Sequence, residues 1–162
     1  MSSGFNADEI FEMALEFERK GVLFYTKASE MFEDPEIRSM LVSLAAMEAE
    51  HEQIFSSMRG RLVGQEGYSE AFDPDGTAAS YVRAMTGGEV FDATVALTGS
   101  ETLRDILKKG IEAEKNSVVF YTGLKRVVPE SLGRDKVEKI IEEEMKHIGI
   151  LSDKLSSLKK LT

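Results

Sequence analysis

The two histidines of this chain lie in residues 46–55, AMEAEHEQIF, and in residues 142–151, EEEMKHIGIL. Each histidine follows a glutamate by three positions, which gives the motifs Glu48-x-x-His51 and Glu144-x-x-His147. Residues three apart on an α-helix lie on one face, so this carboxylate and imidazole can bind one metal ion or reach two adjacent ions. One such pair is unremarkable in a glutamate-rich chain, whereas two pairs at matching positions indicate a common function.

The two motifs belong to an internal repeat. His147 follows His51 by 96 positions (147 − 51 = 96), and the glutamates of the two motifs keep the same offset. At this offset, without an insertion, residues 14–18 match residues 110–114, and FYT at 24–26 matches FYT at 120–122. Two similar helix pairs placed back to back predict a bundle with pseudo-two-fold symmetry.

Helices are expected through most of the 162 residues, because only three prolines interrupt stretches rich in Ala, Leu, Met, Glu and Lys. Apolar periodicity predicts four long helices at about Ala7–Phe32, Pro35–Arg59, Glu101–Val128 and Glu130–Leu161. The expected N-caps are Asn6 or Asp8, then Asp34 before Pro35, then Ser100. Gly60, Gly64 and Gly67 are expected to end the second helix.

The order of these helices predicts an all-α fold, a ferritin-like four-helix bundle over a single domain, residues 1–162. Two helix hairpins, about 7–59 and 101–160, are joined by a connection over residues 61–100, and one long crossover is typical of that bundle. Within the connection, residues 73–76 (DPDG) indicate a turn and residues 78–85 a short helix. Tyr68, Phe72 and Tyr81 are candidates for packing over the bundle or for a dimer face.

Periodicity also decides which glutamates of the first and third helices face the core. Glu18 lies within the apolar stripe of the first helix, and Glu114 lies within that of the third. Glu16 and Glu112 lie among charged residues and are the substitutes if this helical register is wrong. On the histidine helices, Glu48, His51, Glu144 and His147 interrupt the apolar stripes, whereas Glu50, Glu142 and Glu143 fall on the polar faces.

Six polar side chains are therefore expected to point into an apolar core. Buried carboxylates are costly unless they are paired or bind a metal, and the sequence offers no matching Arg or Lys on these faces. Two divalent cations would balance four glutamates, and four glutamates with two histidines is the ligand set of di-iron and di-manganese carboxylate bundles. Such ligands suit iron or manganese, and zinc could also occupy them. The alternative for the histidines is ordinary core packing.

Two tyrosines accompany these glutamates. Tyr25 follows Glu18 by seven positions and Tyr121 follows Glu114 by seven, which is about two turns along the same helix face. A buried tyrosine needs a hydrogen-bond partner, so one expectation is a bond to a metal-binding carboxylate and a catalytic role. Plain core packing is the other.

Several classes of protein are excluded or disfavoured by composition. The chain has no cysteine, so a disulfide, a zinc–thiolate site and an iron–sulfur centre are excluded. It has neither an evident signal peptide nor an apolar run of the length that spans a membrane, and we expect a cytoplasmic protein. The net charge of −9 argues against nucleic acid and anionic membranes as partners.

Together these motifs resemble the rubrerythrin branch of the ferritin-like superfamily, over about residues 7–59 and 101–160. The resemblance rests on Glu18 with Tyr25, Glu48-x-x-His51, Glu114 with Tyr121 and Glu144-x-x-His147. It implies metal ligation by Glu18, Glu48, His51, Glu114, Glu144 and His147, and a homodimer.

The sequence departs from the rubrerythrin pattern in two respects. Rubrerythrins carry a C-terminal rubredoxin domain with four cysteines, and this chain has none. They also have an extra glutamate one turn after the third-helix ligand, where this chain has Ser117. The chain is therefore most similar to the stand-alone rubrerythrin-like proteins.

Three functions follow as hypotheses. The first is an oxidoreductase active in oxidative stress, which reduces peroxide or dioxygen at two iron ions with electrons from an external donor such as rubredoxin. The second is a ferroxidase that handles iron. The third is a non-catalytic helical bundle that its metals stabilise.

Overall fold

The computed structural model describes residues 7–63, 77, 80–81, 84 and 97–159. Residues 7–63 and 97–159 contain four long α-helices and one short 3-10 turn, which confirms the all-α prediction. The elements are α1 (Ala7–Glu30), α2 (Pro35–Val63), α5 (Leu103–Val127), the 3-10 turn η2 (Glu130–Leu132) and α6 (Arg134–Lys159).

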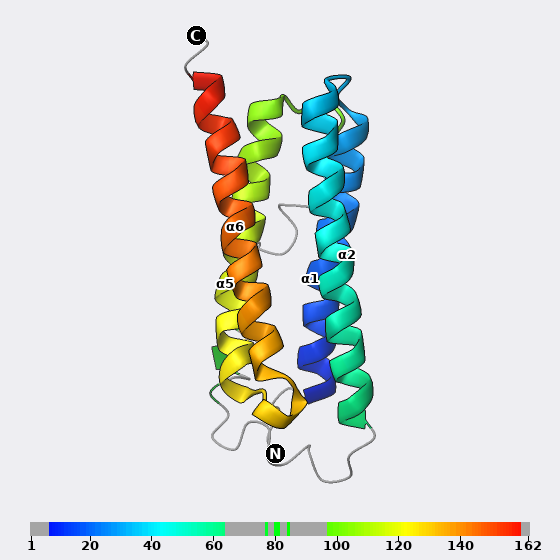
Figure 1. The fold of residues 1–162 in the computed structure, drawn as a ribbon, viewed down its shortest axis with the longest axis vertical. Coiled ribbons are helices and arrows are strands. Elements are labelled where there is room, and N and C mark those ends of the chain that lie inside the picture. The colour runs from blue at the N-terminus through cyan, green and yellow to red at the C-terminus, as the bar shows by residue number, and fades with distance from the viewer. Residues whose placement is uncertain (1–6, 64–76, 78–79, 82–83, 85–96, 160–162) are drawn as a thin grey trace.

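The helices form two antiparallel hairpins, α1 with α2 and α5 with α6, which pack side by side along their whole length (Figure 1). Helix α2 ends at the end of the bundle opposite to the one where α5 begins (Figure 1). This is the ferritin-like arrangement that the sequence predicts. Each of the four long helices forms one corner of the bundle, and each hairpin corresponds to one half of the repeat.

Local side-chain contacts define where the helices begin. Asp34 Oδ1 accepts hydrogen bonds from the backbone N–H groups of Glu36 (2.9 Å) and Ile37 (3.1 Å), which confirms Asp34 as the cap of α2. Thr102, rather than the expected Ser100, caps α5 through a reciprocal capping box with Asp105. Asp8 lies inside α1 and is not its cap.

Helix α2 runs past Gly60, contrary to the prediction that this glycine ends it. The last turn buries Met58 and Leu62 in the core, and the Arg61 guanidinium donates a 2.9 Å hydrogen bond to the carbonyl of Leu132. A glycine in a helix costs only about 1 kcal/mol relative to alanine, so these contacts outweigh it. On the other hairpin, η2 and Gly133, at a φ of 113°, precede α6, which therefore begins at Arg134 rather than Glu130.

Two apolar clusters fill the bundle, one toward each end. The first gathers the start of α1, the end of α2, the end of α5 and the start of α6, with Phe11, Phe55, Phe120, Leu124 and Val137 among its members. The second gathers the opposite halves of the same helices, with Phe24, Leu41, Leu44, Ile106 and Leu151 among its members. Between the clusters lies a layer of buried polar side chains, and this layer is the candidate site.

Most of the connection between the hairpins lies outside the described residues, including the expected turn, Tyr68 and Phe72. Tyr81 is described: it is partly buried against the first apolar cluster, and its hydroxyl donates a hydrogen bond to the carbonyl of Val119. The packing expected for Tyr81 is therefore present. No helix in the described part of the chain has both the length and the apolar character needed to cross a bilayer.

Candidate metal centre

All six side chains expected to bind metal lie in the polar layer at the middle of the bundle. Glu18 comes from α1, Glu48 and His51 from α2, Glu114 from α5, and Glu144 and His147 from α6, and none is more than 3 % exposed. The substitutes Glu16 and Glu112 are exposed to solvent. Apolar periodicity therefore gave the correct inward face for both α1 and α5.

The six residues form two overlapping groups, in each of which the potential ligand atoms lie within 4.8 Å of one another. One group is Glu18, Glu48, His51 and Glu144, and the other is Glu48, Glu114, Glu144 and His147. Glu48 and Glu144 belong to both. This arrangement suits two adjacent metal ions, each with one histidine and one glutamate of its own, that share the other two glutamates.

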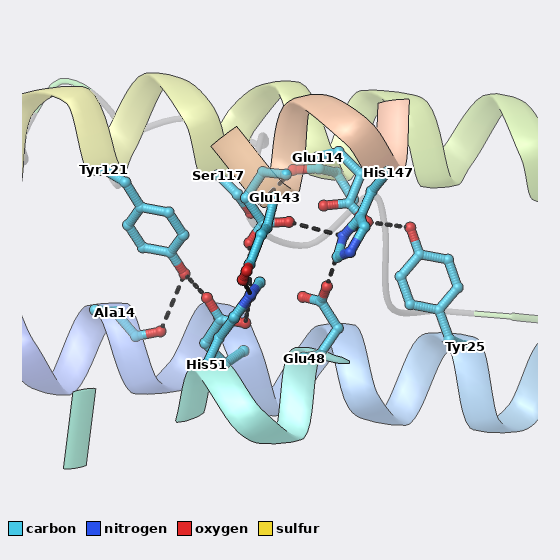
Figure 2. Close-up of polar contacts among 12 residues, drawn as sticks. Ala14, Tyr25, Glu48, His51, Glu114, Ser117, Tyr121, Glu143 and His147 are labelled. Atoms are coloured by element: carbon cyan, nitrogen blue, oxygen red, sulfur yellow. Dashed lines mark hydrogen bonds and ion pairs between the residues drawn. The ribbon is translucent and has the colours of Figure 1, made fainter. Parts of the chain in front are cut away.

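The two imidazoles turn their Nδ1 atoms toward the buried carboxylates of the layer, and both approach the shared Glu144. His51 Nδ1 lies 3.2 Å from Glu144 Oε1 and 3.5 Å from Glu18 Oε2. His147 Nδ1 lies 3.0 Å from Glu144 Oε2, 3.2 Å from Glu48 Oε1 and 3.6 Å from Glu114 Oε1. The rings stack with centroids 5.9 Å apart (Figure 2). Each Nδ1 is thus the nitrogen that is placed to bind a metal.

Many polar atoms of this layer have no hydrogen-bond partner among the described residues. They are Glu18 Oε2, Glu48 Oε1, His51 Nδ1, both carboxylate oxygens of Glu144 and both ring nitrogens of His147. No Arg or Lys is among the buried residues of the described chain. Buried, unpaired oxygens and nitrogens that face one another are costly in a protein core. Cations bound between them would remove that cost, so these residues fit a two-metal centre.

Without metal, the crowded carboxylates and imidazoles strongly perturb one another's pKa values. Burial and the neighbouring carboxylates raise the pKa of Glu48 to about 8 and that of Glu114 to about 8, and burial with Glu48 raises the pKa of Glu18. Burial opposes protonation of the histidines, yet the surrounding carboxylates raise the pKa of His51 to about 11 and that of His147 to about 12.

Glu144 differs from the other three glutamates because it touches both histidines. Burial disfavours its charge, but contacts with His147 and His51 lower its pKa to about 2. In the metal-free protein the central carboxylate is therefore ionised between two imidazolium rings. Without metal, protons on the two histidines offset the negative charge of the carboxylates, as bound cations would do in the metal-bound protein.

The two tyrosines bond carboxylates of the layer from opposite sides (Figure 2). The hydroxyl of Tyr25 donates to Glu114 Oε1, and that of Tyr121 donates to Glu18 Oε1. Both are buried, and burial together with these carboxylates raises both tyrosine pKa values, so the hydroxyls keep their protons. The expected tyrosine–carboxylate bonds are present. Each one, however, joins opposite hairpins instead of linking two residues of one helix.

Glu143 is a polar residue near the site that the sequence interpretation missed. The helical face of Glu143 indicated a solvated side chain, yet its Oε2 lies 2.8 Å from His51 Nε2 and the side chain is only 29 % exposed. Glu50 and Glu142 are exposed, as expected. Glu143 immediately precedes Glu144, at the edge of the inward face. A long side chain at that position can reach a neighbouring helix, and helical periodicity alone does not show this.

The repeat differs at Gly21 and Ser117, which are equivalent positions (117 − 21 = 96). A Cβ at position 21 would lie 2.6 Å from Glu48 Oε2, so the absent side chain leaves room for that carboxylate. Ser117 is buried, and its Oγ donates a 3.2 Å hydrogen bond to the carbonyl of Ala113. It provides no carboxylate, so among the described residues the candidate ligands are the six residues above.

Comparisons with known proteins agree with this geometry. The family model described as Rubrerythrin matches residues 9–155. A crystal structure from Thermotoga maritima, described as a ferritin-like diiron-carboxylate protein, superimposes with a TM-score of 0.69 at 26 % sequence identity. The match covers 96 % of this chain and 98 % of that one. The comparison with curated proteins gave no match.

Proposed function

Because the chain belongs to the rubrerythrin family, we propose that it is a di-iron oxidoreductase that reduces hydrogen peroxide or dioxygen with electrons from a separate donor. One observation carries the proposal. Six buried candidate ligands form two overlapping groups that could each hold a metal ion, and a tyrosine hydroxyl donates to a carboxylate of these groups on each side. A purely structural metal site does not need two cations side by side in a bundle that already has two apolar clusters.

Iron is the metal proposed for both positions. Carboxylate oxygens with one imidazole per ion suit iron and manganese, and zinc can occupy the same donors. When bound, two ferrous ions would supply the two electrons that break the O–O bond of hydrogen peroxide. Dioxygen takes four electrons to become two waters, so in that reaction the external donor would supply the other two. In this proposal Glu18 and His51 would hold one ion, Glu114 and His147 would hold the other, and Glu48 and Glu144, which belong to both groups, could serve either.

Tyr25 and Tyr121 are the proposed catalytic side chains. Reduction of one hydrogen peroxide to two waters consumes two electrons and two protons, so the site needs a proton source in a region closed to bulk water. The raised pKa values keep both phenols protonated beside the carboxylates. Each hydroxyl holds Glu114 or Glu18 in place and can pass a proton toward the centre through that carboxylate.

The electrons come from outside the chain in this proposal. The sequence contains no cysteine, so it has no thiolate-bound iron to relay electrons to the buried layer. A separate rubredoxin or a flavoprotein is the proposed donor. A homodimer in the cytoplasm is the proposed working form, and light scattering of the purified protein tests the dimer.

The test is rapid mixing of the Fe(II)-loaded protein with hydrogen peroxide or with dioxygen, followed by turnover with reduced rubredoxin. The proposal expects oxidation of the bound iron by peroxide or dioxygen, and sustained consumption of that oxidant with the donor. A Tyr25→Phe/Tyr121→Phe double variant should bind two irons and react about 10²-fold more slowly, the scale of a lost acid catalyst.

Other outcomes contradict this proposal in distinct ways. Oxidation of Fe(II) by dioxygen without donor-dependent turnover, with release or storage of ferric iron, would identify a ferroxidase. Tight zinc binding with no oxidation by either reagent would identify a metal-stabilised bundle. In both cases the two-metal centre would stand and the reductase function would fail.

A further inference from the structure

The two histidines of the buried polar layer differ in the surroundings of their Nε2 atoms. His51 Nε2 lies 2.8 Å from Glu143 Oε2 (Figure 2), whereas the other ring nitrogen, Nδ1, faces Glu144 and Glu18. His147 Nε2 is buried and has no hydrogen-bond partner among the residues that the structure describes. The repeat explains the difference, because the position equivalent to Glu143 is Met47 (143 − 47 = 96). A thioether cannot replace a carboxylate as an acceptor of this strength.

The Glu143 bond prepares His51 for metal binding. A carboxylate that accepts the Nε2 proton fixes the imidazole in the tautomer whose Nδ1 lone pair is free, and it also fixes the plane of the ring. Nδ1 of His51 faces Glu18 and Glu144, so once metal binding displaces the Nδ1 proton, the lone pair points into the first metal position. Glu143 also adds a negative charge directly behind this ligand.

His147 lacks this preparation. Its Nδ1 faces Glu48, Glu114 and Glu144 in the same way, so a neutral His147 that binds a metal must carry its proton on Nε2. That N–H group lies in a buried environment without a described acceptor. An unpaired buried donor costs free energy, and among the described residues no carboxylate fixes this ring for metal binding as Glu143 fixes that of His51.

We propose that Glu143 makes the two metal positions unequal, so that the position of Glu18 and His51 fills first and binds its ion more tightly than the position of Glu114 and His147. Glu143 is thus a positioning residue that acts through His51. A chain with a single ion holds it at the Glu18–His51 position. The inference rests on the proposed two-metal site but not on the proposed reaction with peroxide or dioxygen.

The test is anaerobic titration with Co(II), whose visible absorption reports its coordination, in variants that isolate one position. The His147→Ala variant retains the Glu18–His51 position, and the His51→Ala variant retains the other. The proposal expects the His147→Ala protein to bind one Co(II) about 10- to 100-fold more tightly than the His51→Ala protein, the range measured for lost partners of metal-binding histidines.

Adding Glu143→Ala to each single-position variant distinguishes two effects of Glu143: its hydrogen bond to His51, and its negative charge near both metal positions. It should weaken Co(II) binding by about 10- to 100-fold in the His147→Ala background and by less than about threefold in the His51→Ala background. Glu143→Gln should recover part of the loss, because its amide oxygen still accepts the Nε2 proton. Glu142→Ala is the matched control: this neighbour is exposed, carries the same charge and has no bond to His51 in the structure.

A substitution at Met47 tests the other metal position, that of Glu114 and His147. Met47→Glu in the His51→Ala background should strengthen Co(II) binding, because it places a carboxylate at the position equivalent to Glu143. Circular dichroism checks that every variant remains helical, and variants that unfold are replaced by Met47→Gln and Glu143→Gln.

The outcomes separate the inference from the proposed function. Equal affinities in the two single-position variants, or an equal effect of Glu143→Ala on both, would overturn the inference and leave the two-metal site intact. Failure of the unmodified protein to bind two Co(II) ions would overturn both.

Discussion

The hydroxyl of Tyr25 on α1 donates a hydrogen bond to the carboxylate of Glu114 on α5, 89 positions later in the chain. Tyr121 on α5 makes the equivalent bond to Glu18 on α1. The two bonds connect one hairpin to the other, on opposite sides of the buried polar layer (Figure 2). They hold one oxygen of each non-shared glutamate, which leaves the other oxygen for a metal. The same two bonds connect the hairpins at the level of the site.

Loss of either tyrosine hydroxyl should destabilise the metal-free protein. Tyr25→Phe and Tyr121→Phe each leave a buried carboxylate oxygen without its donor, a change that costs about 1–3 kcal/mol. Urea unfolding of the metal-free variants measures the effect, and the pseudo-two-fold repeat predicts similar values for both. Tyr81→Phe is the control, because its hydroxyl bonds a backbone carbonyl in a more exposed region. Equal stability of all three variants and the unmodified protein would contradict the structural role given to Tyr25 and Tyr121.

Substitution of glutamates two positions apart tests which helix face binds metal. Glu18→Ala and Glu114→Ala should each lose at least one bound metal per chain, because each removes a ligand of one position. Glu16→Ala and Glu112→Ala should keep both metals and change stability by less than about 1 kcal/mol, because the ion pairs of these glutamates with Lys20 and Lys115 lie at the surface. Metal analysis after gel filtration measures the stoichiometry. Metal loss in the exposed pair would show that the helical register is wrong.

Metal affinity should rise with pH. Near neutral pH the metal-free layer carries protons on His51 and His147, with pKa values of about 11 and about 12, and largely on Glu48 and Glu114, with pKa values of about 8. A metal ion must displace these protons, so acidification strengthens the competing protonated state and weakens binding. Calorimetry in buffers of different ionisation enthalpy measures the protons released by Co(II). Binding without proton release, and with the same affinity at about pH 6 and about pH 8, would contradict the raised pKa values.

Two helical glycines should respond in opposite ways to alanine. At Gly21 an added Cβ would lie 2.6 Å from Glu48 Oε2, so Gly21→Ala should displace this shared carboxylate and weaken metal binding. At Gly149 on α6 an added Cβ meets no atom within 4 Å, so Gly149→Ala should leave metal binding unchanged and stabilise the helix by about 0.5–1 kcal/mol. Thermal unfolding and metal titration of both variants give the comparison. Unchanged metal binding in Gly21→Ala would show that Glu48 adjusts freely.

The helical repeat explains why so much of the site could be predicted from the sequence. In a helix with one buried face, apolar residues recur with a period of 3.6 residues. Charged residues that interrupt this apolar stripe are therefore visible in the sequence without a structure. Glu18 and Glu114 were distinguished from Glu16 and Glu112 on that basis alone, and the structure places them as expected. The offset of 96 residues then paired the two histidines before any distance was known.

What could not be predicted depends on contacts between helices. Spacing placed Tyr25 near Glu18 on its own helix, whereas the bundle places its hydroxyl against Glu114. Glu143 lies on a polar face by periodicity, but its reach to His51 depends on the distance between α2 and α6. The end of α2 likewise depends on tertiary packing of Met58 and Leu62, which outweighs the low helix propensity of Gly60.

The most direct test of the two-metal centre is anaerobic titration of the metal-free protein with Fe(II), with the tightly bound iron counted per chain. The structure predicts a plateau at two irons, because two overlapping groups of buried ligands are present in one chain. A plateau at one or zero iron would contradict the two-metal centre, and the paired Glu-x-x-His motifs would then form a single-metal site or a purely structural polar layer.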